Sequence, residues 1–535
     1  MISGRIPLTL CAFCALLVRP ATLPAQCGWN AGLFNVDLDG PVRAAQVFDD
    51  GNGPALYIAG EFTASNGVAL NQVARWNGLA WTPLGDGLDG PVFALHVFVG
   101  PDGPSLYAGG AFSHAGAVPA NHVARWNGST WLPLGDGVDG VVRAFAGFHD
   151  GATPVLIAGG DFTSADRQPA ARIAAWNTLT WAAFPPGADA PVHCLLASVD
   201  GGVPVVYAGG DFTAIGSVAA QRIARWDGAH WSALGAGTDD CVQALAEFNG
   251  QLYAGGAFAS AGGAAASCIA RWDGSGWSAV ATGLSGHSTP RVRSLLAYDD
   301  GSGMALFAAG EFTRAGELVV NHIARWTGAL WVPLGSGLAG SAAAGHTMVG
   351  FPGPVGVYVG GRFDAAGGAS SHHVARWSVF GAPPFISGHP AATSACTGGT
   401  ATLTVSVSAP GIGDPIYHWR RDGVYLANGG NLAGVDLPTL TISPVTMQDA
   451  GAYDCVVMGN CRHRVSHAAT LSVWLSGTGD MNADGHVNGA DIQPFVATLA
   501  APGAPDPTVC AADCNADGEV DLNDAPVFVD RLLSE

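Results

Sequence analysis

The sequence predicts a mainly β chain with three parts: a seven-bladed β-propeller, a β-sandwich and a small α-helical tail. Three observations predict this division. A cassette with a period of about fifty residues returns seven times, a different strand pattern begins near residue 383, and two loops rich in aspartate, asparagine and glycine occur near the end of the chain. Repeats of this length, made of short apolar runs and turn residues, are typical of four-stranded blades.

The cassette combines a small-Gly-Gly-x-Phe box with an Ala-Arg-Trp motif about fourteen residues later, and single repeats depart from it, as Ala-Ala-Trp does at residues 174–176. The first cassette contains the runs PVRAAQVF, ALYIAGEF, NQVARW and AWTPLG, separated by turn residues, which indicates four strands. The box phenylalanines are Phe62, Phe112, Phe162, Phe212, Phe258, Phe312 and Phe363, and the motif tryptophans are Trp76, Trp126, Trp176, Trp226, Trp272, Trp326 and Trp377. We expect the paired glycines to lie where blades press together, because a Cβ atom would clash there.

The seventh blade lacks a fourth strand of its own. Six cassettes carry a second tryptophan five residues after the first, but Trp377 is followed by SVFGAPP. The N-terminal stretch CGWNAGLFNVDLDGPV places Trp29 where that tryptophan belongs. We therefore expect this stretch to supply the missing strand, which would close the ring and remove an exposed sheet edge.

These repeats resemble the kelch and galactose-oxidase-like propellers over residues 27–382. The resemblance implies the fold, whereas propellers of this kind serve as enzymes, glycan binders or protein-docking platforms. A copper radical oxidase would need tyrosine and histidine ligands with a thioether cysteine, and the sequence does not show that constellation.

Residues 1–26 combine Arg5, an apolar stretch and a polar end, as a secretory signal peptide does. No later stretch is apolar and long enough to span a membrane. A net charge of −20 argues against a nucleic-acid partner. The nine cysteines after the signal segment are an odd number in a compartment that permits disulfides, and Cys194 fills a small-residue position in its blade. The sequence thus predicts a secreted or cell-surface protein without a membrane span.

Residues 383–476 follow a different pattern, with the motif Asp449-x-Gly451-x-Tyr453-x-Cys455 and a tryptophan at position 419. The segment resembles an immunoglobulin-like domain, which implies a tyrosine corner at Tyr453 and a core tryptophan at Trp419. The expected partner strand of Cys455 carries Val405 and Val407 instead of cysteine, so the disulfide pairing stays open.

Two twelve-residue segments, DMNADGHVNGAD and DCNADGEVDLND, match calcium-binding loops. Gly485 and Gly518 occupy the turn position, and oxygen donors recur at the ligand positions, so we expect two Ca²⁺ ions. The predicted ligands are Asp480, Asn482, Asp484, His486, Asn488 and Asp491 in the first loop and Asp513, Asn515, Asp517, Glu519, Asp521 and Asp524 in the second.

The paired loops resemble a type I dockerin over residues 477–535, which implies attachment to a cohesin-like or cell-surface protein. The partner-choice positions of such domains hold Gly489, Ala490, Leu522 and Asn523 rather than a hydroxyl pair, which puts a cohesin in doubt. Structural calcium is the alternative.

Aligning the first strand of every cassette on its Val-x-small pattern brings seven residues to one position, and we call these the ring residues. They could line the central channel and bind an anionic glycan or protein, or they could merely cap the strand entrances. The ring residues are Arg43, Phe93, Arg143, His193, Gln243, Arg293 and His346.

Two further recurring sets are predicted to be architectural. Asx turns are expected at Asp39, Asp89, Asp139, Asp189 and Asp239. The arginines before the motif tryptophans, such as Arg75, Arg225 and Arg325, are expected to pair with the box acids Glu61, Asp211 and Glu311.

Together these features favour a secreted, non-enzymatic binding or scaffold protein. The alternative is a carbohydrate-active enzyme, that is, a galactose-oxidase-like oxidase, a hydrolase or a lyase, with its site on the propeller.

Overall fold

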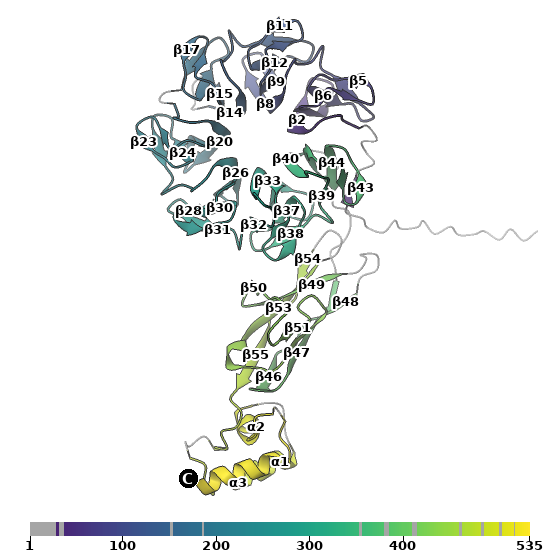
Figure 1. Ribbon diagram of the computed structural model, residues 1–535, viewed down its shortest axis with the longest axis vertical. Helices are drawn as coiled ribbons and strands as arrows, with labels where there is room; N and C mark the ends of the chain where they lie inside the picture. Colours follow the sequence, from purple (N-terminus) through teal and green to yellow (C-terminus); the bar gives the residue numbers. More distant parts are fainter. Residues whose placement is uncertain are drawn as a thin grey trace, which may run out of the picture.

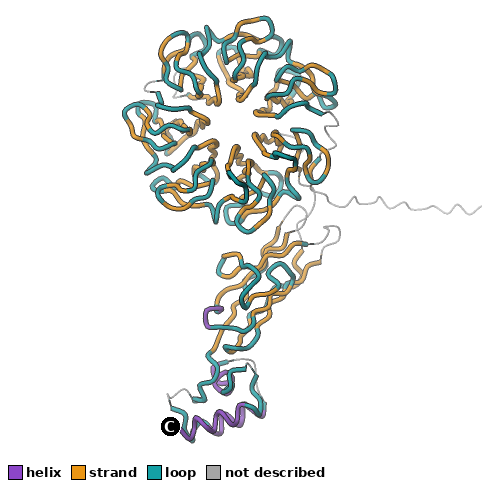
Figure 2. Tube along the Cα trace, viewed as in Figure 1, coloured by secondary structure: helices purple, strands orange, loops and turns teal. Residues whose placement is uncertain are grey.

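The computed structural model describes residues 28–30, 37–149, 154–184, 187–351, 356–378, 385–408, 415–458, 463–482, 486–501, 506–517 and 519–534. The predicted signal segment 1–26 lies outside these residues. The described chain is mainly β, as predicted, with three α-helices near its C-terminus (Figures 1 and 2). No helix in these ranges has the length and apolar character needed to cross a bilayer.

Residues 28–378 contain seven four-stranded antiparallel sheets, which lie around a common centre in Figure 1. Each repeat contributes one sheet whose first three strands are joined as a meander, because short apolar runs alternate with turns. The first sheet has β2 (Val42–Asp49), β3 (Pro54–Gly60), β6 (Val73–Trp76) and β7 (Trp81–Pro83); the second has β8 (Val92–Gly100), β9 (Gly103–Gly110), β12 (Val123–Trp126) and β13 (Trp131–Pro133); the third has β14 (Val142–Phe148), β15 (Val155–Gly160), β18 (Ile173–Trp176) and β19 (Trp181–Ala183).

The remaining sheets repeat this plan. The fourth has β20 (Val192–Asp200), β21 (Val203–Gly210), β24 (Ile223–Trp226) and β25 (Trp231–Ala233); the fifth has β26 (Val242–Phe248), β27 (Gln251–Gly256), β30 (Ile269–Trp272) and β31 (Trp277–Ala279); the sixth has β33 (Arg291–Asp299), β34 (Met304–Glu311), β37 (Ile323–Trp326) and β38 (Trp331–Pro333); the seventh has β40 (Ala344–Gly350), β41 (Val357–Arg362), β44 (Val374–Ser378) and β1 (Gly28–Trp29).

Small outer hairpins follow the second strand of each sheet. They are β4–β5 (Ala64–Ser65, Val68–Ala69), β10–β11 (His114–Ala115, Val118–Pro119), β16–β17 (Ser164–Ala165, Gln168–Pro169), β22–β23 (Ala214–Ile215, Val218–Ala219), β28–β29 (Ser260–Ala261, Ala264–Ala265), β35–β36 (Arg314–Ala315, Leu318–Val319) and β42–β43 (Ala365–Ala366, Ala369–Ser370). Two of them gain a third strand, β32 (Leu284–Ser285) beside β35 and β39 (Leu338–Ala339) beside β42.

The seventh sheet takes its outer strand from the N-terminal stretch. Trp29 pairs with Trp377, and Gly28 pairs with Ser378. Trp29 donates its indole N–H to the Leu334 carbonyl at 2.8 Å, as Trp131 of the second sheet does to the Leu84 carbonyl at 2.9 Å. The first strands contact one another in the order β2, β8, β14, β20, β26, β33 and β40, and β40 contacts β2 in turn.

The paired glycines allow two different close approaches. A Cβ atom on Gly109, the first of its pair, would lie 2.5 Å from the Val142 side chain of the next sheet. A Cβ atom on Gly110 would lie 2.1 Å from the Pro91 carbonyl oxygen of its own sheet. The expected contact between neighbouring sheets therefore holds for the first glycine, whereas the second glycine serves packing within one sheet.

We expect Gly110→Ala to destabilise the seven sheets by about 1–3 kcal/mol, since the added methyl group would meet a backbone atom that cannot rotate away. Gly276→Ala is the matched control, because a Cβ atom there has nothing within 4 Å. Tryptophan fluorescence during urea unfolding measures both variants, since fourteen of the sixteen tryptophans belong to these sheets. Equal unfolding midpoints for the two variants would contradict the close-approach argument.

Residues 385–474 form a β-sandwich. One sheet joins β46 (Thr393–Cys396), β55 (Ala469–Trp474), β53 (Gly451–Met458), β49 (Ile416–Arg421), β50 (Val424–Tyr425) and β54 (His463–Val465); another joins β47 (Ala401–Thr404), β52 (Thr439–Ile442) and β51 (Leu432–Ala433); β45 (Phe385–Gly388) pairs with β48 (Ser406–Ser408), and a 3₁₀ helix spans Met447–Asp449. Tyr453 donates its hydroxyl to the Asp449 carbonyl at 2.7 Å, and Trp419 is fully buried. Both predicted roles are confirmed.

The sandwich contacts both of its neighbours. Val456 and Met458 of β53 belong to one buried apolar cluster with Leu330 and Val332 of the sixth sheet. At the other end, a disulfide joins Cys396 to Cys510. This bond resolves one pairing that the sequence left open, while Cys455 is a buried free thiol, and Cys27 and Cys461 lie outside the described residues.

The tail has three helices, α1 (Ile492–Ala500), α2 (Pro507–Ala512) and α3 (Asp524–Ser534). Phe495 of α1 stacks on Phe528 of α3, with ring centroids 4.0 Å apart. These two residues occupy equivalent positions of the two predicted calcium loops and their following helices. The tail core is therefore built symmetrically from its two repeats.

Candidate binding cavity and calcium loops

All seven ring residues line one cavity of about 470 Å³, together with Glu61. The same local feature places each of them there. In every sheet the pairing of the first two strands shifts by one residue at the ring position, as between Val42 and Ala44 around Arg43. A β-bulge of this kind redirects one side chain. The repeated bulge thus turns the seven ring side chains toward the cavity.

Four sheets pair a basic ring residue with an acid of their own box. Arg43 donates to Glu61 at 2.7 Å, and Arg143 donates through Nε and Nη2 to Asp161 at 2.7 and 2.6 Å. The other two pairs are His193 with Asp211 at 2.8 Å and Arg293 with Glu311 at 2.6 and 2.9 Å. Charge-assisted hydrogen bonds from arginine are strong, so the three arginine pairs hold their guanidinium groups in place.

The predicted partners of the box acids are therefore wrong. Three of the arginines that precede motif tryptophans pair elsewhere: Arg75 with Asp50, Arg225 with Asp200 and Arg325 with Asp300. The strand register explains the error, because Arg75 lies opposite Tyr57, four residues before Glu61. The box acids pair with the ring residues instead.

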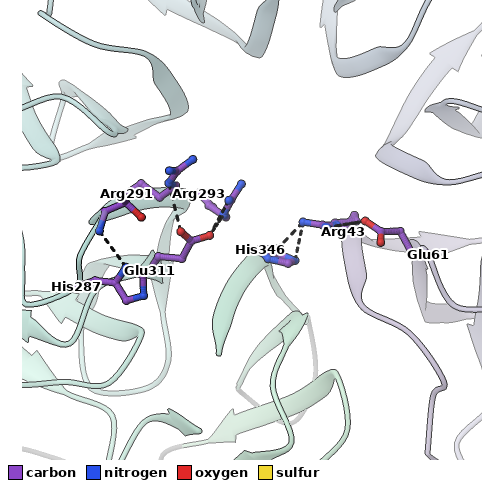
Figure 3. Close-up of polar contacts among 8 residues, drawn as sticks. Arg43, Glu61, His287, Arg291, Arg293, Glu311 and His346 are labelled. Atoms are coloured by element: carbon purple, nitrogen blue, oxygen red, sulfur yellow. Dashed lines mark hydrogen bonds and ion pairs between the residues drawn. The ribbon is translucent and has the colours of Figure 1, made fainter. Parts of the chain in front are cut away.

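The remaining sheets lack such pairs. Phe93 and Gln243 have Ala111 and Ala257 at the box position. Phe93 lies beneath the Arg143 guanidinium, 5.9 Å from the ring centroid. In the seventh sheet, His346 lies beside Arg43, whose Nη1 is 3.3 Å from Nδ1 and 3.4 Å from Nε2 of the imidazole (Figure 3).

The environment of these two residues disfavours further positive charge. Burial, the nearby Arg43 and the nearby Arg293 lower the pKa of His346 to about 3, so the imidazole is neutral at pH 7. Burial also lowers the pKa of Arg43, and the charges of Arg293 and Arg362 lower it further, while Glu61 opposes the shift. Burial and the neighbouring guanidinium groups thus keep this side of the cavity free of a charged imidazole.

The recurring aspartates do not form the predicted Asx turns. Asp39 instead accepts hydrogen bonds from the backbone N–H groups of Thr63 and Ala64, at 2.7 and 2.9 Å, and Asp89 binds Ser113 and His114 in the same way. Burial raises the pKa of Asp89, but these hydrogen bonds outweigh it and lower the pKa to about 2. Through these hydrogen bonds, the aspartates connect the outer hairpin to the segment that begins their sheet.

The two predicted calcium loops share one hydrogen-bond pattern around their last aspartate. Asp491 accepts from the N–H groups of Asn482 and Asn488, at 3.1 and 2.9 Å. Asp524 accepts from those of Asn515 and Asp521, at 3.0 and 2.9 Å. Asp484 and the turn glycines Gly485 and Gly518 lie outside the described residues, and the other predicted ligands lie along these two loops.

Three carboxylates of the loops, those of Asp491, Asp513 and Asp524, are fully buried. No arginine forms an ion pair with Asp491 or Asp524 among the described residues. Burying carboxylates without a counter-charge is costly, so the donors fit a hard cation such as Ca²⁺. Within the described ranges no three His, Cys, Asp or Glu side chains form a metal-binding group. The predicted sets use asparagine and backbone oxygens as well, and calcium stays a prediction.

Comparison with known proteins concerns the middle of the chain. Residues 383–458 match the family described as Immunoglobulin domain. These residues form an immunoglobulin-like domain. Solved structures similar to it include the titin M10 and obscurin-like 1 Ig complex (26% identity, 18% of this chain, 97% of that chain, TM-score 0.16), the titin M3 domain (24%, 17%, 95%, 0.15) and the tandem Ig repeats of Dlar (18%, 24%, 74%, 0.17). No curated protein matches the chain.

The sequence identified the ring residues but missed Glu61 as part of the cavity. A signal for it exists: in the four paired sheets the box acid follows the ring residue by eighteen positions, and an acid occurs only where the ring residue is basic. The bulge that turns the ring residues has no comparable signal in the sequence.

Proposed function

We propose that the protein is a secreted, non-enzymatic binding protein whose seven sheets form a kelch-like β-propeller closed by the N-terminal strand. The cavity at its centre recognises a glycan or a protein, and the immunoglobulin-like domain is a spacer. The tail is a calcium-ordered, dockerin-like module for attachment to a cohesin-like or cell-surface protein. The observation that carries the proposal is the convergence of all seven ring residues on one cavity.

The chemistry of the cavity favours binding over catalysis. Arg43 donates to Glu61 at 2.7 Å, so this carboxylate is held by an ion pair. Glycoside hydrolases use two carboxyl groups that flank the scissile bond, whereas Glu61 is the single acid among the described residues of the lining. The lining acid is thus suited to hold its arginine in position.

One observation favours the alternative of a carbohydrate-active enzyme. His193 lies 2.8 Å from Asp211, and a carboxylate that orients an imidazole is an arrangement used by general bases. No second pair of this kind lines the cavity in the described part of the chain. The single dyad keeps the enzyme as the second candidate.

A panel of immobilised uronate-containing, sulfated and neutral polysaccharides tests the proposal with the full chain. Surface plasmon resonance reports binding, and assays for reducing ends, unsaturated products and peroxide report hydrolase, lyase and oxidase activity. Binding without turnover is the expected result. Turnover that disappears in His193→Ala would establish that the protein is an enzyme. If no polysaccharide of the panel binds, the proposal of a glycan ligand is wrong.

A further inference from the structure

The seventh sheet breaks the charge pattern that the other sheets follow at the cavity. A basic ring residue is matched by a box acid in four sheets, and an uncharged ring residue is matched by alanine in two. In the seventh sheet the ring residue is His346 and the box position holds Arg362. This sheet therefore presents two nitrogen-bearing side chains and no carboxylate.

Arg362 ends β41 and is exposed. No hydrogen bond or ion pair engages its guanidinium among the residues that the structure describes. Arg362 lies opposite Ala344, two residues before His346, and side chains at the same box position of four other sheets reach the ring residue at 2.6–2.8 Å. Its charge also contributes to lowering the pKa of Arg43 and His346. Arg362 is thus an available cation at the edge of the ring.

The adjacent sheets do not balance this charge. Arg291 and Arg293 of the sixth sheet share the single acid Glu311, and Arg43 of the first sheet has Glu61 (Figure 3). Together with Arg362 of the seventh sheet, these neighbouring sheets carry four guanidinium groups and two carboxylates. Such local positive charge in a protein of net charge −20 would attract an anion to this point.

We propose that Arg43, His346 and Arg362 form a subsite for one carboxylate or sulfate group of an acidic saccharide. The subsite rests on the proposed binding function of the cavity. The guanidinium groups offer charge-assisted hydrogen bonds to the oxyanion, and the neutral His346 imidazole can donate one N–H without adding charge.

The rest of the lining favours a saccharide over an apolar peptide side chain. Seven of the eight lining side chains are polar or charged, and the face of Phe93 is already covered by Arg143. The hydroxyl groups of a saccharide would form hydrogen bonds with these polar side chains. A volume of about 470 Å³ lies within the range of small-molecule sites, which suits the end of a sugar chain.

Calorimetric titration of the full chain with glucuronate, glucose and sulfate at fixed ionic strength tests the subsite. We expect glucuronate to bind at least about tenfold more tightly than glucose or sulfate, because only glucuronate offers both the anion and the hydroxyl groups. Arg362→Glu, which installs the acid of the other sheets, is expected to remove this preference, and Arg362→Ala to weaken it. Arg167→Glu is the control, since Arg167 is 82% exposed and pairs with Asp136 away from the cavity lining.

Equal affinity for glucuronate and glucose would overturn the subsite, as would an unchanged affinity in a folded Arg362→Glu variant. If sulfate bound as tightly as glucuronate, the site would recognise a simple anion, and the assignment of a saccharide ligand would be wrong. If the protein bound only the neutral polysaccharides of the panel, the proposed binding function would hold but the anion subsite would be wrong. Melting temperatures of all variants separate lost binding from lost folding.

Discussion

Asp300→Asn is expected to destabilise the sixth sheet by about 3–5 kcal/mol, the range seen when one partner of a buried ion pair is removed. Asp300 is completely buried, and its two carboxylate oxygens accept hydrogen bonds from Arg325 Nη1 at 3.0 and 3.1 Å. It also accepts the indole N–H of Trp377 at 3.3 Å, from the seventh sheet. Asparagine preserves the shape but leaves the buried Arg325 without its counter-charge.

The repeats offer a matched control for this substitution. Asp200 and Arg225 stand at the corresponding positions of the fourth sheet, with the same separation of twenty-five residues, but the Asp200 side chain is 52% exposed. Exposed pairs contribute about 0–1 kcal/mol, so Asp200→Asn is expected to change little. Urea unfolding monitored by tryptophan fluorescence compares the two variants. Similar losses in both would show that burial does not decide the strength of these pairs.

The strict repeat explains how much of the cavity could be predicted. Aligning the cassettes brought Arg43 and its six equivalents to one position, and the structure places all of them in one lining. Their salt-bridge partners could not be predicted in the same way. Arg43 and Arg75 both lie on strands adjacent to the box strand, and only the register and the bulge decide which of them reaches Glu61.

Contacts between different domains were harder to predict than contacts within the repeats. The Cys396–Cys510 disulfide joins residues 114 positions apart, in two different parts of the chain, so no local pattern indicates it. The immunoglobulin-like segment was easier, because the Asp-x-Gly-x-Tyr-x-Cys motif requires a local contact, the Tyr453 hydroxyl with the Asp449 carbonyl. Features that depend on short-range geometry could thus be predicted from this sequence, whereas features that depend on domain packing could not.

Removal of calcium is expected to unfold the loops of the tail. Without the predicted cation, no arginine among the described residues offsets the burial of the Asp491 and Asp524 carboxylates. A ligand at one hundred times its dissociation constant stabilises the folded state by about 2.7 kcal/mol per site, enough to decide the fold of so small a unit. The disulfide would still hold Cys510 of the unfolded tail beside Cys396 of the immunoglobulin-like domain.

Calcium titration into the chelator-treated full chain measures this directly. We expect two ions per chain, one in Asp491→Ala or Asp524→Ala, and none in the double variant. Asp506→Ala is the control, because Asp506 caps α2 by accepting the Val509 N–H and lies in neither loop. It should retain two sites while losing about 1 kcal/mol of helix stability.

Hydrogen exchange of the tail distinguishes ordering by calcium from simple attachment of the ion. Slow exchange of the α1 and α3 amides in calcium, lost in chelator, would mean that the metal and the helices form together. The stacked Phe495 and Phe528 rings connect the two halves, so losing one site should also weaken protection in the other helix. Equal protection with and without calcium would contradict a calcium-ordered tail and leave the disulfide and the aromatic core as its source of stability.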